Sequence, residues 1–351
     1  MAYTTIDNPF KHFNTKIYTG NGSTQSITGV GFQPDWVWIK NRGAVTNHEV
    51  ADSVRGVNKL LKPNDTDAEQ SNSNKITSFD SNGFAVGNDA NVNQNSTAIV
   101  SWNWLAANGT ASNSDGSITS TVSANTTAGF SIVSYTGTGS AGTLGHGLSA
   151  VPKMIILKER VGTENWMVYH AGNTSAPETD YLLLNTTSAT ADYPVWNDTA
   201  PTSSVFSIGS DSSTSTSGDT YIAYCFAEKK GYSKFGSYTG NGNADGTFVY
   251  TGFKPAWVMR KYTTGGSASG EGWEMLDSAR SLFNVADKRL KADSSGAEST
   301  GSNYYVDFLS NGFKCRTVDN ATNNSGATYI YMAFAESPFV TAGTKAAGTA
   351  K

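Results

Sequence analysis

Charged residues are scarce in this sequence. Asp, Glu, Lys and Arg make up 15% of its 351 residues, against about 25% in typical soluble domains. The formal net charge is -4, and Lys and Arg are scattered without any basic run. Because nucleic-acid binding relies on clustered positive charge, we expect no nucleic-acid partner.

Cysteine and long apolar runs are scarce as well. The sequence has two cysteines, Cys225 and Cys315, whereas a disulfide framework or a zinc site needs more, so we expect both to be reduced core residues. No run approaches the roughly 20 apolar residues that span a bilayer. The first residues also lack the charged and apolar regions of a signal peptide. We therefore expect synthesis in the cytoplasm and no membrane association.

Glycine, serine, threonine and asparagine are abundant instead. The 36 glycines and the neutral polar residues are typical of a turn-rich chain, and such composition also occurs in disordered proteins. Regular runs of aromatic and β-branched residues argue against disorder, because they bury enough surface to offset chain entropy. The composition therefore favours an all-β protein.

A Tyr-Thr-Gly motif occurs three times and organises the chain. Its copies begin at Tyr18, Tyr135 and Tyr238, so the motif returns after 117 and then 103 residues. Each copy leads into an apolar strand that begins with proline and ends with lysine, at residues 34–40, 152–158 and 255–261. A period of this length fits a small β-sandwich domain better than a solenoid unit. We predict three tandem β-sandwich repeats of the jelly-roll type.

The repeats set the expected boundaries. These are an N-terminal attachment arm at 1–15, a first repeat at 16–106, a Gly/Ser/Thr/Asn-rich linker at 107–128, a second repeat at 129–228, a third repeat at 231–336 and a flexible C-terminal tail at 337–351. Within the linker, the alternation at 117–122 leaves a strand open. Phe10 and Phe13 give the arm two apolar anchors, so it is either a disordered end or an arm that docks on a partner.

Chemistry-bearing residues form few patterns. Asp and Arg recur three apart as Asp52–Arg55 and Asp277–Arg280. The pairs could grip a sugar, but a scaffold ion pair that repeats with the fold is the favoured interpretation. Asp65, Asp67 and Glu69 could bind Ca²⁺, although the loop lacks the glycine and bidentate glutamate of a calcium loop.

The four histidines lack metal-ligand spacing, and the sequence has no nucleophile motif. We expect no enzyme active site, cofactor or metal, while carboxylate pairs for sugar hydrolysis stay open because they need not be close in sequence.

Aromatic residues in loop or strand-end contexts are the remaining candidates for a binding site. Such side chains form platforms for sugars or partner proteins. The alternative is a second core aromatic residue in each repeat. The candidates are Trp166, Trp196, Trp273, Tyr304 and Tyr305.

Several long motifs resemble a known family. They include GFQPDWVWIKNR at 31–42, SFDSNGFAVG at 78–87, YIAYCFAE at 221–228 and YIYMAFAE at 329–336. With the three Tyr-Thr-Gly copies, they resemble phage-encoded virion proteins of marine tailed phages, which are often described as fibre-like. The resemblance covers about residues 1–336 and implies a structural virion component made in the host cytoplasm.

The resemblance leaves the position on the virion open. One interpretation is a tail-fibre or spike subunit that binds host-surface glycans. A capsid decoration or head-fibre protein is the second, and a glycan depolymerase is the third. In each case we expect other virion proteins as partners and a homo-oligomer, with a trimer favoured because phage fibres and decorations are closed assemblies.

Overall fold

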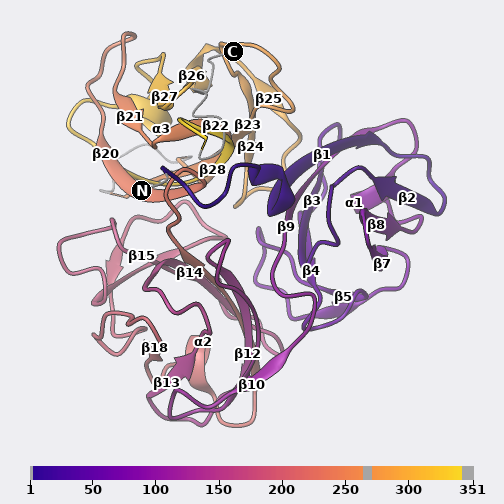
Figure 1. Cartoon of the computed structure of the whole chain (residues 1–351), viewed down its shortest axis with the longest axis vertical. Coiled ribbons are helices and arrows are strands. Elements are labelled where there is room, and N and C mark those ends of the chain that lie inside the picture. The colour runs from indigo at the N-terminus through magenta and orange to yellow at the C-terminus, as the bar shows by residue number, and fades with distance from the viewer. Residues whose placement is uncertain (1–2, 264–270, 342–351) are drawn as a thin grey trace.

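The computed structural model describes residues 3–263 and 271–341, and the protein is all-β, as predicted. Three β-structured units lie around a common centre (Figure 1). We call them the first, second and third repeat, at residues 13–106, 111–227 and 233–338. The three groups of strands surround the middle of the molecule, so each repeat contacts both of the others (Figure 1).

The large sheets of the three repeats share one antiparallel strand order. The first is β1 (Phe13–Thr19), β9 (Ala98–Trp104), β3 (Trp36–Asn41) and β4 (Glu49–Asp52). The second contains β12 (Phe130–Thr136), β19 (Thr220–Ala227), β14 (Pro152–Glu159) and β15 (Met167–His170), followed by β16 (Asp180–Leu183) and β17 (Ala191–Asp192). The third is β20 (Ser233–Thr239), β28 (Thr328–Pro338), β22 (Phe253–Tyr262), β23 (Glu274–Asp277), β24 (Lys288–Lys291) and β25 (Ser299–Thr300). The strand that closes each repeat lies between the first strand and the Pro-led strand.

A smaller sheet covers the outer side of each large sheet. These sheets are β2 (Gln25–Thr28), β8 (Gly83–Val86) and β7 (Ile76–Asp80); β13 (Gly142–Gly145) and β18 (Val205–Ile208); and β21 (Phe248–Tyr250), β27 (Gly312–Cys315) and β26 (Val306–Leu309). β5 (Lys59–Leu60) pairs with β6 (Gln70–Ser71) in the first repeat. One helical turn precedes each closing strand, namely α1 (Ala90–Asn93), α2 (Ser212–Ser215) and α3 (Asn320–Asn323). Two 3-10 turns also occur in the described residues, η1 (Pro9–Lys11) and η2 (Ser302–Tyr304).

The described part of the chain forms four hydrophobic cores. Three lie between the large and the small sheet of each repeat. The fourth is shared, because the inner faces of all three large sheets meet at the centre. The central strands are therefore covered on both faces, and all six residues of β3 are buried. Burial on both faces explains why the Pro-led strands read as continuous apolar runs instead of alternating ones.

Aromatic rings join the three repeats pairwise in the shared core. Trp36 of the first repeat stacks on Tyr224 of the second, with ring centroids 4.4 Å apart. Trp104 of the first repeat contacts Trp257 of the third at 5.8 Å. Phe226 of the second contacts Phe334 of the third at 6.2 Å. Large apolar interfaces of this kind fix domains relative to one another.

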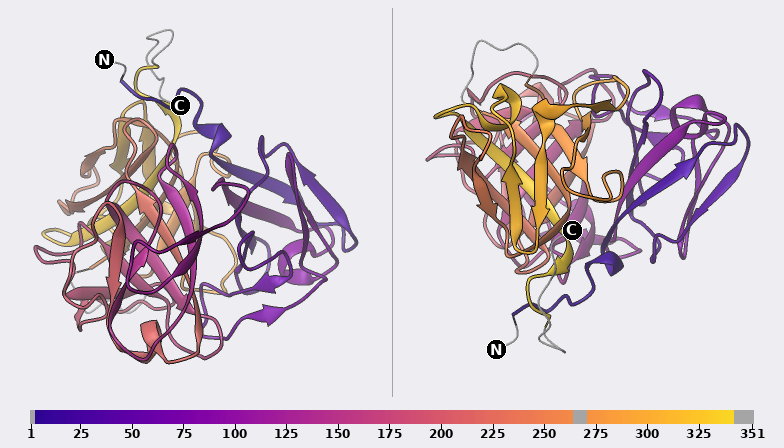
Figure 2. Two further views of the ribbon diagram at one scale, coloured as in Figure 1. Left: turned by 60° about the horizontal axis from the view of Figure 1, so that its bottom comes forward. Right: turned by 90° about the horizontal axis from the view of Figure 1, so that it is seen from above.

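The N-terminal residues differ from the arm that we expected. β1 already begins at Phe13, whose side chain is fully buried in the shared core and stacks on Phe334 at 4.9 Å. Phe13 is therefore a core residue and not an anchor for a partner, whereas Phe10 is 38% exposed. Ahead of β1, the Tyr3 hydroxyl donates to Gly252 O of the third repeat at 2.6 Å. The two ends of the described chain lie at the same end of the molecule (Figure 2).

The segment expected to be a linker contains two strands. β10 (Ala111–Asn113) and β11 (Ser120–Asn125) extend the large sheet of the second repeat beyond β12. The alternation at 117–122 thus leads into β11, which lies between the edge strand β10 and β12 and has one face in the second core, where Val122 is buried. The expected tail at 337–351 falls outside the described residues from 342 onward, and β28 continues to Pro338.

Candidate functional site

The two Asp–Arg pairs lie between repeats. We call the contact region between two repeats a joint. Asp52 accepts from Arg55 Nε at 2.5 Å, and both side chains are fully buried. The same carboxylate accepts from the Tyr224 hydroxyl of the second repeat at 2.8 Å. Burial acts to lower the pKa of the Arg55 guanidinium, but the adjacent Asp52 carboxylate outweighs it and holds that pKa above its ordinary value. A pair enclosed in this way joins two repeats and is closed to a sugar.

The second pair repeats this arrangement at another joint. Asp277 accepts from Arg280 Nε at 2.5 Å, again between fully buried side chains. Its carboxylate also accepts from Trp102 Nε1 of the first repeat at 3.1 Å. At the corresponding place in the second repeat, His170 Nε2 lies 3.1 Å from Tyr331 O of the third repeat. Burial lowers the pKa of His170 to about 4, so this third joint is uncharged near neutral pH.

A second ring of contacts surrounds these pairs. Glu69 binds Arg160 of the second repeat through two contacts of 2.9 and 3.0 Å, and it also contacts Arg55 at 3.1 Å. Glu298 binds Arg42 of the first repeat in the same bidentate way, at 2.8 and 2.7 Å. Bidentate Arg–carboxylate pairs are strong and directional. Ion pairs therefore fix two of the three joints.

The third joint keeps the backbone contact but has no equivalent Arg–carboxylate pair among the residues that the structure describes. Glu69 N donates to Arg160 O at 2.8 Å, and Glu298 N donates to Arg42 O at 2.8 Å. Between the second and third repeats the same bond runs from Thr190 N to Thr263 O at 3.2 Å. Equivalent backbone bonds at all three joints show that the repeats pack in one cyclic arrangement.

The acidic loop of the first repeat is used in the same joints. Glu69 forms the ion pair described above, and Asp67 pairs with Lys62 at 2.5 Å. Asp65 accepts from Thr66 N at 2.8 Å. Across residues 3–263 and 271–341, no cluster of three His, Cys, Asp or Glu side chains could hold a metal ion.

The three candidate tryptophans are buried, so the prediction that they contact a glycan is wrong. Trp166 directly precedes β15, and its Nε1 donates across the joint to Lys62 O at 2.9 Å. Trp273 directly precedes β23, and its Nε1 donates to Leu183 O of the second repeat at 2.8 Å. Trp196 lies in the second repeat's own core against Tyr169. A ring with 1 or 2% of its surface exposed cannot stack on a sugar.

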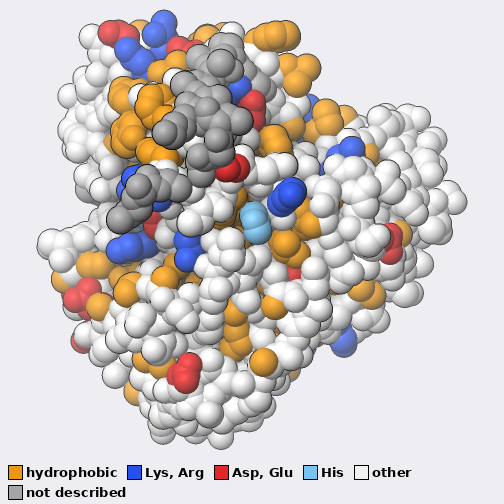
Figure 3. Space-filling view, in the orientation of Figure 1, with side chains coloured by type: hydrophobic (Ala, Val, Ile, Leu, Met, Phe, Trp, Pro, Cys, Tyr) orange, Lys and Arg blue, Asp and Glu red, His pale blue; other side chains and the backbone are white. Residues whose placement is uncertain are grey.

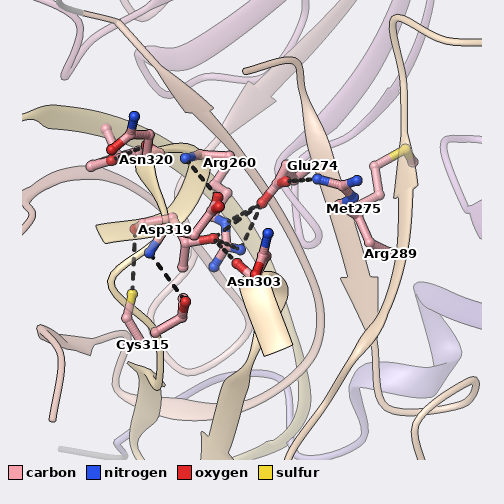
Figure 4. A network of polar contacts seen from close by, with 12 residues as sticks. Arg260, Glu274, Met275, Arg289, Asn303, Cys315, Asp319 and Asn320 are labelled. Carbon is pink, nitrogen blue, oxygen red and sulfur yellow. Dashed lines mark hydrogen bonds and ion pairs between the residues drawn. The ribbon is translucent and has the colours of Figure 1, made fainter. Parts of the chain in front are cut away.

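The two candidate tyrosines border a polar network in the third repeat. The Arg289 guanidinium lies 3.4 Å above the centre of the Tyr304 ring. Arg289 and the fully buried Arg260 both point at Glu274 from opposite sides, each 2.7 Å from one of its oxygens (Figure 4). Tyr304 and Tyr305 are both half-buried. Tyr304 is thus occupied by an intramolecular cation–π contact.

The lysines that end the Pro-led strands are buried at the joints. Lys40 Nζ donates to Thr46 O at 2.9 Å and to Ser295 O of the third repeat at 3.2 Å. Lys261 Nζ donates to Thr187 O of the second repeat at 3.1 Å. Burial lowers the pKa of Lys40, Lys158 and Lys261 to about 8. Carbonyl oxygens take the place of water around these ammonium groups.

Two surface hollows lie on either side of the chain that connects the first repeat to the second. Their volumes are about 370 and 320 Å³, and both are lined by Gly109 and Thr110. The first is otherwise lined by small residues such as Ala111 and Asn113, and the second includes the Phe79 ring. Neither lining contains a titratable side chain, so these hollows offer shape and hydrogen bonds without acid–base chemistry.

One outer face carries exposed aromatic residues. Phe248 and Tyr250 of β21 are 44% and 54% exposed and point away from the core, while Val249 between them points inward. By the sheet register, Ser26 and Thr143 stand in place of Phe248 on the other small sheets, and Thr28 and Gly145 stand in place of Tyr250. In the view of Figure 3, hydrophobic side chains gather over the third repeat, whereas the first repeat is mostly neutral and polar.

Charged side chains border these two rings. Lys314 lies directly opposite Phe248 in the sheet, and Asp307 lies beyond Lys314. Lys314 also pairs with the exposed Asp245 at 2.6 Å. We call Asp245, Phe248, Tyr250, Asp307, Lys314 and Arg316 the aromatic face.

Comparison with protein families places the whole repeat region in one unit. A family model described as "Domain of unknown function (DUF7483)" matches residues 8–338. The chain belongs to this family. The match begins before β1 and ends with β28, so the family covers all three repeats and their shared core. Neither curated proteins nor solved structures gave a match.

The aromatic face of this DUF7483 domain was not among the sites predicted from the sequence. Phe248 and Tyr250 lie two residues apart with Val249 between them, so in a strand both rings share one face and Val249 takes the other. Comparison of outward positions among the repeats would also have found it, because only the third repeat has aromatic residues there among the three small sheets described. None of the helices in the described residues has both the length and the apolar character needed to cross a membrane.

Proposed function

We propose that this protein is a non-enzymatic structural component of a phage virion, namely a tail-fibre or spike-type subunit that contacts host-surface glycans. The observation that carries the proposal is the shared aromatic core with its buried ion pairs. It unites three sandwiches in one rigid body. The charged side chains that could have formed a reactive site instead hold the repeats together. The resemblance to fibre-like virion proteins supports the same role.

The aromatic face is the proposed contact surface. Aromatic rings pack against the C–H groups of sugar rings, and exposed carboxylates and cations bind their hydroxyls. Phe248 and Tyr250 supply the rings, and Asp245 and Arg316 supply exposed polar groups beside them. The rigid sheet beneath them holds these groups at fixed distances, which reduces the entropy lost on binding.

The end that holds both termini is the proposed attachment side. Tyr3 donates to Gly252 O, and Phe339 N donates to the same oxygen at 3.3 Å, so both ends of the described chain meet there. The aromatic face adjoins this end, because the Tyr250 hydroxyl lies 3.5 Å from the Tyr3 hydroxyl. Attachment through one end suits a fibre on the tail. It also suits the second candidate, a capsid decoration or head-fibre protein. In both cases the partners are other virion proteins, and a homotrimer stays a prediction.

The proposal is tested on purified particles of the phage that encodes the chain. Mass spectrometry should find the protein in the particles in a fixed copy number. A phage with Phe248→Ala and Tyr250→Ala should assemble normally and adsorb poorly, whereas Ser26→Ala, on the equivalent face of the first repeat, should adsorb normally. Particles without the protein would refute the structural role, and unchanged adsorption of the double variant would refute the contact surface. Release of reducing ends from host polysaccharide by the purified protein would contradict the non-enzymatic part.

A further inference from the structure

Lys75, Asn91 and Glu49 form a polar trio in the first repeat. Glu49 begins β4, Lys75 directly precedes β7, and Asn91 belongs to α1. Asn91 Nδ2 donates to Glu49 Oε1 at 2.7 Å, and Lys75 Nζ donates to the same oxygen. One carboxylate oxygen thus holds an amine and a carboxamide side by side.

The trio lies in a desolvated place. Glu49 is fully buried, Lys75 is 3% exposed, and Asn91 is half-buried. Glu49 Oε2 has no hydrogen-bond partner among the described residues. Burial raises the pKa of Glu49, although the Lys75 ammonium acts in the opposite direction. In such a place the protonated, neutral form of Glu49 costs less to bury than its carboxylate, which suits a group that takes up and releases a proton.

We infer that Lys75 and Asn91 become joined by an isopeptide bond, with Glu49 as the catalytic proton carrier. The inference rests on the shared contact with Glu49 Oε1 and on the burial of the amine. It is independent of the proposed virion role.

The reaction balances without any further reagent. Glu49 accepts a proton from the Lys75 ammonium, and the lone pair of the resulting amine attacks the Asn91 side-chain carbonyl carbon. The protonated carboxyl stabilises the oxygen of the tetrahedral intermediate and delivers a proton to the amide nitrogen. The bond from carbon to that nitrogen breaks and ammonia is released. Nζ then gives its second proton to the Glu49 carboxylate, so that the new Nζ–carbon bond becomes a neutral amide, and Glu49 passes this proton to the ammonia, which departs as ammonium. Glu49 is regenerated, and no electron donor or acceptor is required.

The other repeats provide an internal comparison. The first residue of the strand equivalent to β4 is Met167 in the second repeat and Glu274 in the third. Glu274 is held by Arg260 and Arg289. A guanidinium stays protonated and is not a nucleophile, so the same buried glutamate in the third repeat forms ion pairs only.

The test is the mass of the purified full-length protein, measured after folding and again after prolonged incubation. We expect the intact mass to fall short of the sequence mass by one ammonia. We also expect trypsin to leave the chain uncut after Lys75 and to give one branched peptide that contains Lys75 and Asn91. An unchanged mass with cleavage after Lys75 would overturn the inference and would leave the trio as an ion pair solvated by an amide.

Three variants separate this reaction from other losses of ammonia. Succinimide formation at Asn–Gly sequences such as Asn82–Gly83 gives the same mass change, so the loss must map to Lys75 and Asn91. Lys75→Arg and Glu49→Gln should each restore the full mass, and Lys75→Arg keeps the positive charge if Glu49→Gln fails to fold. Glu274→Gln is the matched control and should keep the cross-link. A mass loss that persists in Lys75→Arg would also overturn the inference.

Discussion

Trp102 of β9 donates its indole N–H to the Asp277 carboxylate of β23 at 3.1 Å, from the first repeat to the third. The bond ends on a carboxylate that also holds Arg280, so an aromatic core residue and a buried ion pair meet at one joint. The Tyr224 hydroxyl makes the same connection to Asp52 at the next joint. The three repeats therefore behave as one folding body, and substitutions at the joints should destabilise all of them.

Asp277→Ala should lower the free energy of unfolding by about 3 kcal/mol, because it leaves the buried Arg280 without its main partner. This value is at the lower end of the range for broken buried ion pairs, since Glu298 still contacts Arg280 at 3.0 Å. Urea denaturation measures it. Asp245→Ala removes an exposed carboxylate that pairs with Lys314 and is the control, which should change stability little. Equal losses for the two variants would contradict a buried structural pair.

Trp166→Phe should cost more stability than Trp196→Phe. The Trp166 indole N–H donates to Lys62 O across a joint, whereas the Trp196 indole N–H has no partner among the described residues. Both substitutions shorten a buried ring, so the difference isolates the hydrogen bond, which is worth about 0.5–1.5 kcal/mol. The two midpoints of chemical denaturation give this difference. A larger loss for Trp196→Phe would show that the bond does not hold the joint.

Phe13→Ala should cost about 3–5 kcal/mol, as expected for a fully buried phenylalanine. Its ring stacks on Phe334 of the third repeat, so the loss should lower the melting temperature of the whole protein in one transition. Phe10→Ala removes a ring only three residues earlier that is 38% exposed, and it should cost under about 1 kcal/mol. If both variants melted like the parent protein, the residues before β1 would be a free arm after all.

The buried lysines should make stability rise with pH between about pH 8 and pH 10. Their folded pKa is about 8, below the ordinary value of about 10.4, so in this window the unfolded chain binds more protons than the folded one. This gain in stability is absent below the pKa of the folded state and is complete above the pKa of the unfolded state. Cys225 acts in the opposite direction, because burial raises its pKa.

The lysine effect is therefore measured as a difference from Lys158→Met. Wild-type stability should improve relative to this variant as the pH rises through the window. Parallel pH curves for the two proteins would mean that Lys158 titrates normally in the folded state.

Much of the fold is predictable from local pattern. The Tyr-Thr-Gly motif and the Pro-led strands repeat because each repeat needs the same turn and the same central strand, and the structure has both in three places. The start of the fold was misplaced because Phe13 belongs to β1 through its contact with Phe334, more than 300 residues away in sequence. No local signal carries a contact of that separation.

The site residues were harder to predict for a related reason. Trp166 and Trp273 lie just before a strand and outside the core of their own repeat, so they look available for a ligand. The neighbouring repeat buries them. The sequence of one repeat does not tell which surface of another repeat covers the face that lies away from its own core. Phe248 and Tyr250 show the reverse case, because a β-strand rich in aromatic residues reads as core although two of its side chains face outward.

The most direct test of the account is a cryo-electron microscopy reconstruction of the intact phage particle. We predict density for the three-repeat body at the tail or on the capsid surface, with Phe248 and Tyr250 of the aromatic face left uncovered by the neighbouring virion proteins. Particles whose density has no place for this body, with the protein found only in the soluble fraction of infected cells, would contradict the account.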